Sequence, residues 1–305
     1  MVKKIKFCNM FRAFSLGLVL LTANASATLL TLENTFSLGS QLSISPINFN
    51  PTGLGYDSST GELLYAQVHR GTDLYRSDLT GSNVSSMFVG TVPHPSFGSC
   101  SGYYNTAVAA DANNYYFSNY CNNSGGYDVF SLSKTTGTVT QISSEIAASG
   151  GTPLDVRGGN LYRTEASTGY DYSNLDQIRV SSLSSPDTFT STVTLAGSQG
   201  IADFAIDLSS NSVWTLDYLS SASIRRFDLS TGAMLDVFNL GLDGLTAGLT
   251  FANNKLYHYD HITGSSQLRV YNVAQTSSSV PESSAFLLML LGLGCVVARK
   301  FERKN

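Results

Sequence analysis

The sequence of 305 residues predicts an all-β fold, on three observations. No long stretch with a helical period of apolar residues occurs between residues 28 and 279. A turn followed by a strand with an aromatic ending recurs five times, and the endings lie 43 to 52 residues apart: Tyr65, Phe117, Tyr162, Trp214 and Tyr257. A strand that alternates apolar and polar residues follows each of them. Short strands grouped in fours at this spacing are typical of β-propeller blades.

Each repeat is expected to contain four strands. An inner strand comes first, and the aromatic strand is second, as in residues 61–65. The third strand leads into a turn, as in residues 224–232, where Asp228 and Gly232 flank the turn. An outer strand, such as residues 235–238, completes the blade.

The last repeat ends at Gln275 before it has a fourth strand. Residues 29–38 alternate apolar and polar residues and are a spare strand at the other end of the chain. We expect this strand to complete the fifth blade and close the ring, which removes open sheet edges. The prediction is therefore five four-stranded blades in one domain, residues 28–275, with six blades or a β-sandwich as alternatives.

The N-terminus indicates export. Four basic residues precede an apolar segment, residues 13–21, and the small residues Ala25, Ser26 and Ala27 follow it. This order is typical of a secretory signal peptide, residues 1–27. Cleavage after Ala27 would make Thr28 the first residue of the mature chain.

The C-terminus has a second apolar segment. A Ser-rich linker and a turn, residues 276–284, lead to a predicted membrane helix with a basic tail, residues 285–305. The apolar part, residues 285–298, is shorter than the roughly 20 residues that span a bilayer comfortably, which suits a temporary anchor. The basic residues that follow favour the cytoplasmic side.

The order of this C-terminus resembles the PEP-CTERM sorting signal. The resemblance covers residues 280–305 only and rests on the turn, the apolar segment and the basic junction: Val280, Pro281, Glu282, Ser283, Arg299 and Lys300. Ser283 stands where the family usually has a second proline. The resemblance implies transient anchoring in the inner membrane of a Gram-negative bacterium that makes exopolysaccharide, processing by an exosortase, and release to the cell envelope, surface or matrix. An ordinary C-terminal anchor is the alternative.

Charge excludes some partners. Eight of the 18 basic residues but only one of the 22 acidic residues lie in the two end segments, so residues 28–282 keep 10 basic and 21 acidic side chains. Nucleic acid and anionic lipid are therefore poor partners, because phosphate binding needs clustered Lys and Arg. Signal peptidase and an exosortase-type enzyme are the expected processing partners, and exopolysaccharide or other surface proteins are candidates for binding.

Two cysteines remain outside the end segments, Cys100 and Cys121. In an exported protein such a pair usually forms a disulfide. Free or metal-bound thiols are the alternative, but no neighbouring histidine or second cysteine pair supplies the other ligands of a zinc site.

Loops that join the second strand to the third carry the polar candidates for ligand binding: His69, Arg70, Asp217, His258, Asp260 and His261. The last three are the densest cluster, and imidazole with carboxylate can bind transition metals. On a strand, however, His258 and Asp260 point one way and His261 the other. We therefore expect no metal and no cofactor.

Tyrosines are the other candidates, since their rings can stack on sugars. Most of them occupy positions expected in blade cores, where packing is the default role. The exceptions are two pairs near the cysteines: Tyr103, Tyr104, Tyr115 and Tyr116.

An enzymatic hypothesis rests on carboxylates. Asp155, Asp203 and Asp243 lie near the starts of the inner strands of repeats three to five, and a glycoside hydrolase needs two carboxylates. The first two repeats have no equivalent acid, and no Gly-x-Ser-x-Gly motif occurs. We expect these aspartates to cap strands and turns. The sequence thus favours a non-enzymatic surface or matrix protein with an adhesion, scaffolding or ligand-binding role, and a glycan-binding module or a hydrolase is the alternative.

Overall fold

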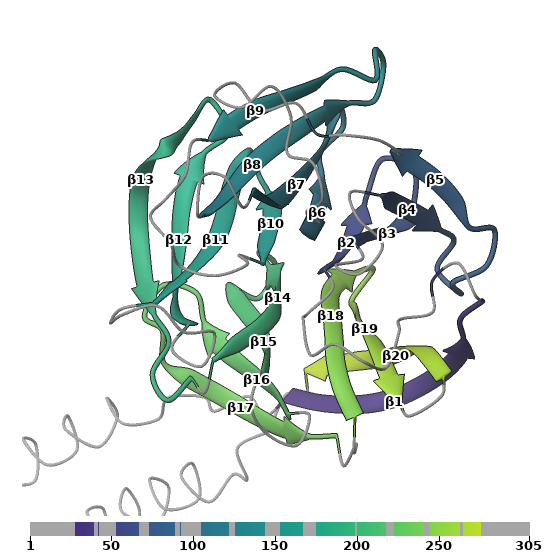
Figure 1. Cartoon of the computed structure of the whole chain (residues 1–305). Helices are drawn as coiled ribbons and strands as arrows, with labels where there is room; N and C mark the ends of the chain where they lie inside the picture. Colours follow the sequence, from purple (N-terminus) through teal and green to yellow (C-terminus); the bar gives the residue numbers. More distant parts are fainter. Residues whose placement is uncertain are drawn as a thin grey trace, which may run out of the picture. The chain divides into compact units, whose positions relative to one another are not determined.

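A computed structural model describes residues 28–39, 42, 53–66, 73–88, 92, 105–121, 126–143, 153–166, 175–198, 200–217, 223–240, 244–262 and 265–275. Residues 30–273 form one compact unit, and residues 1–29 with 274–305 form another. The first unit contains five four-stranded antiparallel sheets arranged as a β-propeller (Figure 1). The all-β propeller prediction is confirmed, including the blade number.

The first four blades each use four consecutive strands, from the inner strand to the outer strand. Blade 1 contains β2 (Gly53–Asp57), β3 (Glu62–Ala66), β4 (Leu74–Ser77) and β5 (Ser85–Phe88). Blade 2 contains β6 (Asn105–Ala110), β7 (Asn114–Cys121), β8 (Gly126–Ser133) and β9 (Val139–Ser143). Blade 3 contains β10 (Leu154–Arg157), β11 (Asn160–Ala166), β12 (Leu175–Ser182) and β13 (Ser185–Thr194). Blade 4 contains β14 (Ile201–Asp207), β15 (Ser212–Asp217), β16 (Ser223–Asp228) and β17 (Met234–Asn239).

Blade 5 joins the two ends of the propeller sequence. Its inner strand is β18 (Gly244–Ala252), followed outward by β19 (Lys255–Ile262) and β20 (Ser265–Gln275), and its outer strand is β1 (Thr28–Ser37). Just beyond β1, the Leu38 amide donates a hydrogen bond of 2.9 Å to the Ser266 carbonyl. Glu33 on β1 also pairs with Lys255 on β19, at 2.7 Å. The predicted closure by the N-terminal strand is confirmed (Figure 1).

Turn residues explain the short links between inner and second strands. Asn253 and Asn254 in blade 5, and Gly158 and Gly159 in blade 3, all have positive φ values. Two consecutive residues in this region form the type I′ turn that matches the twist of a two-residue hairpin, and Asn and Gly adopt it at the least cost. These pairs therefore fix the register of the inner hairpin in their blades.

Aspartates cap the turns between third and outer strands in blades 1 and 4. Asp228 Oδ1 accepts hydrogen bonds from the amides of Ser230 and Thr231, at 3.0 and 2.7 Å. Asp78 Oδ1 accepts from the amides of Thr80 and Ser82 in the same way. Such capping satisfies amides that the strand ladder leaves unpaired, which is why the motif recurs.

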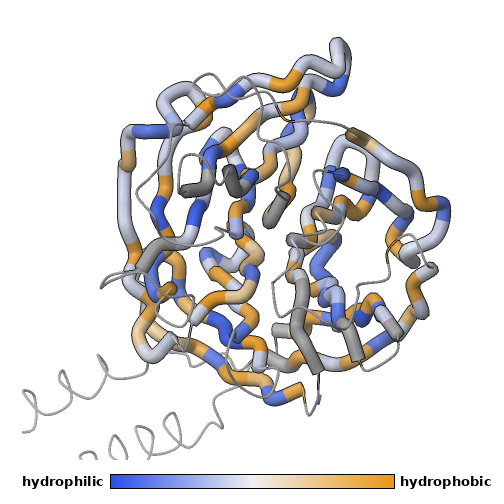
Figure 2. Tube along the Cα trace, viewed as in Figure 1, coloured by the Kyte–Doolittle hydropathy of each residue, from blue (hydrophilic) through white to orange (hydrophobic). Residues whose placement is uncertain are grey.

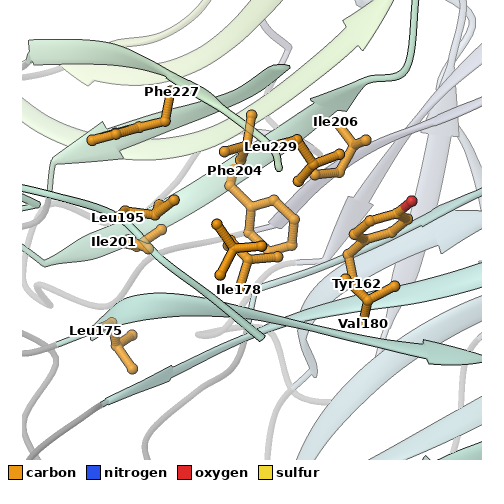
Figure 3. Packing of buried hydrophobic residues seen from close by; sticks show 12 residues of the cluster. Tyr162, Leu175, Ile178, Val180, Leu195, Ile201, Phe204, Ile206, Phe227 and Leu229 are labelled. Carbon is orange, nitrogen blue, oxygen red and sulfur yellow. The ribbon is translucent and has the colours of Figure 1, made fainter. Parts of the chain in front are cut away.

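The core consists of layers between neighbouring blades, because each sheet buries both faces. Hydrophobic and hydrophilic positions alternate along many of the strands (Figure 2). Between blades 3 and 4, Tyr162 and Ile178 pack with Phe204, Ile206 and Phe227. Figure 3 shows the Phe204 ring of β14 beside Ile178 of β12. This packing holds successive blades together face to face.

Candidate functional site

Asp217, a candidate for ligand binding, lies at the end of β15 with its side chain buried. Its two carboxylate oxygens are each 2.9 Å from Nε of Arg225 on the neighbouring strand β16. Arg225 Nη1 also donates to the Gly197 carbonyl, at 3.1 Å, in the segment that joins blades 3 and 4. Burial raises the pKa of Asp217, and Arg225 opposes this rise. The carboxylate is thus engaged in an internal ion pair within blade 4, and the same arginine also binds the segment that leads in from blade 3.

Asp260 occupies the equivalent place in blade 5. Its Oδ2 accepts a hydrogen bond from Nε of Arg269, at 3.0 Å, and its side chain is fully buried. In both blades the arginine lies opposite the residue two positions before the acid: Thr215 faces Arg225, and His258 faces Arg269. The two blades therefore repeat one buried ion pair at one register position.

His258 is fully buried on β19, opposite Arg269 and two residues before Asp260. Neither of its ring nitrogens has a hydrogen-bond partner. Burial, assisted by the positive charge of Arg269, lowers the pKa of His258 to about 3. The imidazole is therefore neutral at physiological pH.

A metal site does not form around this cluster in the described residues. His258, Tyr259 and Asp260 follow one another along β19, so the bend that would gather both histidines is absent there. No group of three His, Cys, Asp or Glu side chains capable of holding a metal occurs in the described part of the chain. The side chain of His261 lies outside the described residues, as do His69 and Arg70.

The two described acids of the enzymatic hypothesis lie on inner strands, as expected. Asp155 on β10 accepts hydrogen bonds from the amides of Val156 and Ile206, at 2.7 and 3.0 Å, and from Arg157 Nε at 3.2 Å. Ile206 belongs to β14, so Asp155 connects blades 3 and 4. Asp243 lies outside the described residues.

Asp203 on β14 is buried more deeply. Its Oδ1 accepts from the Phe204 amide at 2.9 Å, and its Oδ2 accepts from the amides of Leu249 and Leu54, at 2.8 and 3.2 Å. Burial raises the pKa of Asp203 well above that of an ordinary aspartate, and the three amide donors oppose the rise. Every oxygen of Asp155 and Asp203 thus already accepts a hydrogen bond from the protein. The arrangement holds inner strands together.

Tyr115 and Tyr116 are buried, so the expectation of an exposed stacking surface is wrong for this pair. The Tyr116 hydroxyl donates to Asp111 Oδ2 at 2.6 Å. Lys134 Nζ lies 4.8 Å from the centre of the Tyr115 ring, and it also pairs with Asp57 at 2.6 Å. Tyr103 and Tyr104 lie outside the described residues.

Basic side chains in the described part of the chain interact with other side chains of the same protein, and the sequence analysis did not predict these interactions. Most form ion pairs: Arg76 with Glu62, Lys134 with Asp57, Arg157 with Asp155, Arg225 with Asp217, Arg226 with Asp236, Lys255 with Glu33, and Arg269 with Asp260. Arg163 and Arg179 both stack on Phe189, at 5.1 and 4.7 Å. For three of these pairs the signal that could have revealed them is an arginine on the third strand close to the register of an acid on the second strand: Arg76 with Glu62, Arg225 with Asp217, and Arg269 with Asp260.

The predicted sorting residues and one cysteine of the predicted disulfide lie in parts of the chain that the structure does not describe. Ala27, the residues from Val280 to Ser283, Arg299, Lys300 and Cys100 lie outside the described residues, and Cys121 is described only as the last residue of β7. Within the described ranges, no helix has the length and hydropathy that a membrane crossing requires.

Comparison with known proteins finds similar solved structures but no matching family. No family model matches the chain, and no curated protein matches it. Similar solved structures include the nidogen/laminin complex, with 14% identity, a TM-score of 0.44 and coverage of 68% of this chain and 71% of that chain. A gluconolactonase from Xanthomonas campestris has 11% identity, a TM-score of 0.46 and 72% coverage of both chains. BamB from Moraxella catarrhalis has 12% identity, a TM-score of 0.39 and coverage of 80% of this chain and 100% of that chain. The chain is a five-bladed β-propeller.

Proposed function

We propose that this chain is an exported, non-enzymatic β-propeller that acts as an adhesion, scaffolding or ligand-binding module at the cell surface or in the extracellular matrix. Its delivery would use the signal peptide and the PEP-CTERM-like signal. Signal peptidase and an exosortase-type enzyme would be its processing partners, with a transient stay at the inner membrane.

The observation that carries this proposal is that the charged groups bind to other parts of the propeller itself. The acids proposed for catalysis, Asp155 and Asp203, accept hydrogen bonds from amides on both oxygens. A general acid or nucleophile must instead face the substrate. A ring whose charges stabilise its own blades suits a rigid platform for binding.

Export is supported by the position of β1. This strand begins at Thr28, the residue that would follow signal-peptide cleavage. Cleavage at Ala27 would therefore leave the closure strand intact. The acidic balance and the internally paired basic residues also make nucleic acid a poor partner.

The proposal is tested by the intact mass of the protein recovered from the envelope and from the medium of the producing bacterium. We expect a species that begins at Thr28 and ends near Glu282. The double variant R299A/K300A should keep its C-terminus and stay with the membrane, whereas K255A, a surface control, should be processed like the wild type. A protein recovered from the cytosol with both ends intact would contradict export, and an intact C-terminus in every fraction would leave a plain anchor.

A ligand of the propeller, whether a glycan or another surface protein, would be bound through the connections between second and third strands that carry His69 and Arg70. The buried state of Asp217, His258 and Asp260 favours these residues over the other candidates. Binding to the producer's own exopolysaccharide should be lost in the H69A/R70A variant and kept in H258L. Equal binding by both variants would contradict this assignment.

A further inference from the structure

Asp203 contacts three inner strands at once. Its own strand β14 belongs to blade 4, Leu249 lies on β18 of blade 5, and Leu54 lies on β2 of blade 1. The bond to Leu54 spans 149 positions of the sequence. A single carboxylate therefore joins three consecutive blades.

Inner strands of neighbouring blades approach one another closely. Gly55 shows how closely the inner strands of blades 1 and 2 approach, since a Cβ there would collide with the backbone carbonyl of Val108. Such close approach brings the amides of Leu249 and Leu54 within hydrogen-bond distance of one Asp203 oxygen.

These contacts coincide with the place where the chain has to close on itself. The connections between blades 1 and 2, 2 and 3, 3 and 4, and 4 and 5 are covalent, because each outer strand leads to the next inner strand. In blade 5 the outer strand β1 also leads to the next inner strand, β2, but β1 and β20 are joined by strand pairing alone. Without that pairing, β18 and β2 are connected along the chain only through the other blades.

We propose that Asp203 is the closure latch of this propeller, a buried carboxylate that fastens the inner strands of blades 5 and 1 to blade 4 independently of the outer strand β1. Asp203 thus adds a polar closure at the inner strands to the two other closures of this seam, the strand β1 at the rim and the apolar cluster that blades 5 and 1 share. Loss of the inner closure would open the seam between blades 5 and 1 while the covalent joints stay intact.

Asp155 provides a matched control. It is also an inner-strand aspartate that accepts amide hydrogen bonds, but its bond to Ile206 joins blades 3 and 4, which are covalently connected. Asparagine at either position keeps the size of the side chain and replaces one acceptor oxygen by an NH2 group, which cannot accept from an amide.

The test is hydrogen exchange of individual amides, measured by NMR on the wild-type chain and on the D203N and D155N variants. In D203N we expect exchange at Leu54 and Leu249 to accelerate by about tenfold or more, which corresponds to loss of one hydrogen bond. D155N should accelerate exchange at Ile206 and leave Leu54 and Leu249 unchanged. Unchanged exchange at Leu54 and Leu249 in D203N, or equal acceleration there in both variants, would overturn the proposal.

A second measurement covers the case in which D203N does not fold. In the wild-type protein, one opening event should expose both amides that share Asp203 Oδ2. Their protection factors should therefore agree within about tenfold, because residues that open together share one opening free energy. A larger difference would show that the two strands open separately and would overturn the latch.

Discussion

Single buried groups set the response of this propeller to pH. His258 has no hydrogen-bond partner on either nitrogen, and burial lowers its pKa from 6.5 to about 3. The unfolded chain therefore takes up a proton below pH 6.5 that the folded protein refuses. The contribution of this group to stability is complete above pH 6.5 and decreases as the pH falls toward 3, at about 1.4 kcal/mol per pH unit.

The H258L variant should remove this dependence. At pH 7 we expect it to be at least as stable as the wild type, because two unsatisfied buried nitrogens disappear. At pH 4 its free energy of unfolding, measured with urea, should exceed that of the wild type by a clear margin. The matched control is H69L, which should keep the acid lability of the wild type. If the free energy of unfolding of H258L fell with pH as steeply as that of the wild type, His258 would have to be protonated in the folded protein at low pH.

Buried and exposed ion pairs should differ strongly in how much they contribute to the free energy of unfolding. Asp217 and Arg225 are buried with 1% and 12% of their side chains exposed, whereas Lys255 and Glu33 are 35% and 38% exposed. Removing one partner of the buried pair, as in R225M, should cost about 3–5 kcal/mol, because a buried charge loses its ion-pair partner. K255M should cost about 1 kcal/mol or less. Thermal and urea unfolding of both variants and of the double variant D217N/R225M provide the comparison, and equal costs for R225M and K255M would contradict the expectation.

At the scale of elements, substitution of two glycines should show how contacts with a neighbouring blade restrict a turn. Gly137 and Gly232 close equivalent turns in blades 2 and 4, with φ values of 69° and 71°. A Cβ at Gly137 would meet nothing, whereas a Cβ at Gly232 would collide with the Thr194 carbonyl of β13. G137A should therefore cost about 1 kcal/mol from the unfavourable φ alone. G232A should cost more and loosen the joint between blades 3 and 4. Urea unfolding measures both, and a cost for G232A no larger than that for G137A would mean that β13 moves aside freely.

The elements themselves were readable from the sequence because strand periodicity and turn chemistry are local. The aromatic endings from Tyr65 to Tyr257 marked the second strands, and the unpaired segment after residue 28 marked the closure strand. The inner-strand positions of Asp155 and Asp203 were also predicted. The partners of Asp203 were not, since Leu54 lies 149 positions away and only the curvature of the ring brings its amide to the carboxylate. The pairing of Asp217 and Asp260 with arginines was missed because polar residues near strand ends were interpreted as loop residues.

For the whole molecule, closure of the ring depends on the pairing of β1 with β20, the first and last strands of the propeller sequence. β1 covers the edge of β20, and its side chains pack on both sides of blade 5: Leu30 near Trp214 and Ile224, and Phe36 near Leu268. A propeller without β1 would expose the backbone of β20 as an open edge. The full ring therefore depends on a strand that is separated from its partner by the whole sequence of the other blades.

Deletion of residues 28–38 from a chain of residues 28–282 should increase its self-association, because unpaired β20 edges can pair with each other. A synthetic peptide of residues 28–38 added in excess should reverse this association, by the same strand addition that peptide-binding sheets use. A control peptide with L30D and F36D should fail, since it would place charges in the two apolar layers. Light scattering after size-exclusion chromatography distinguishes the species. If the deleted chain shows no added self-association and keeps its unfolding temperature, the Asp203 latch and the apolar cluster shared by blades 5 and 1 suffice to close the ring, and β1 is dispensable for closure.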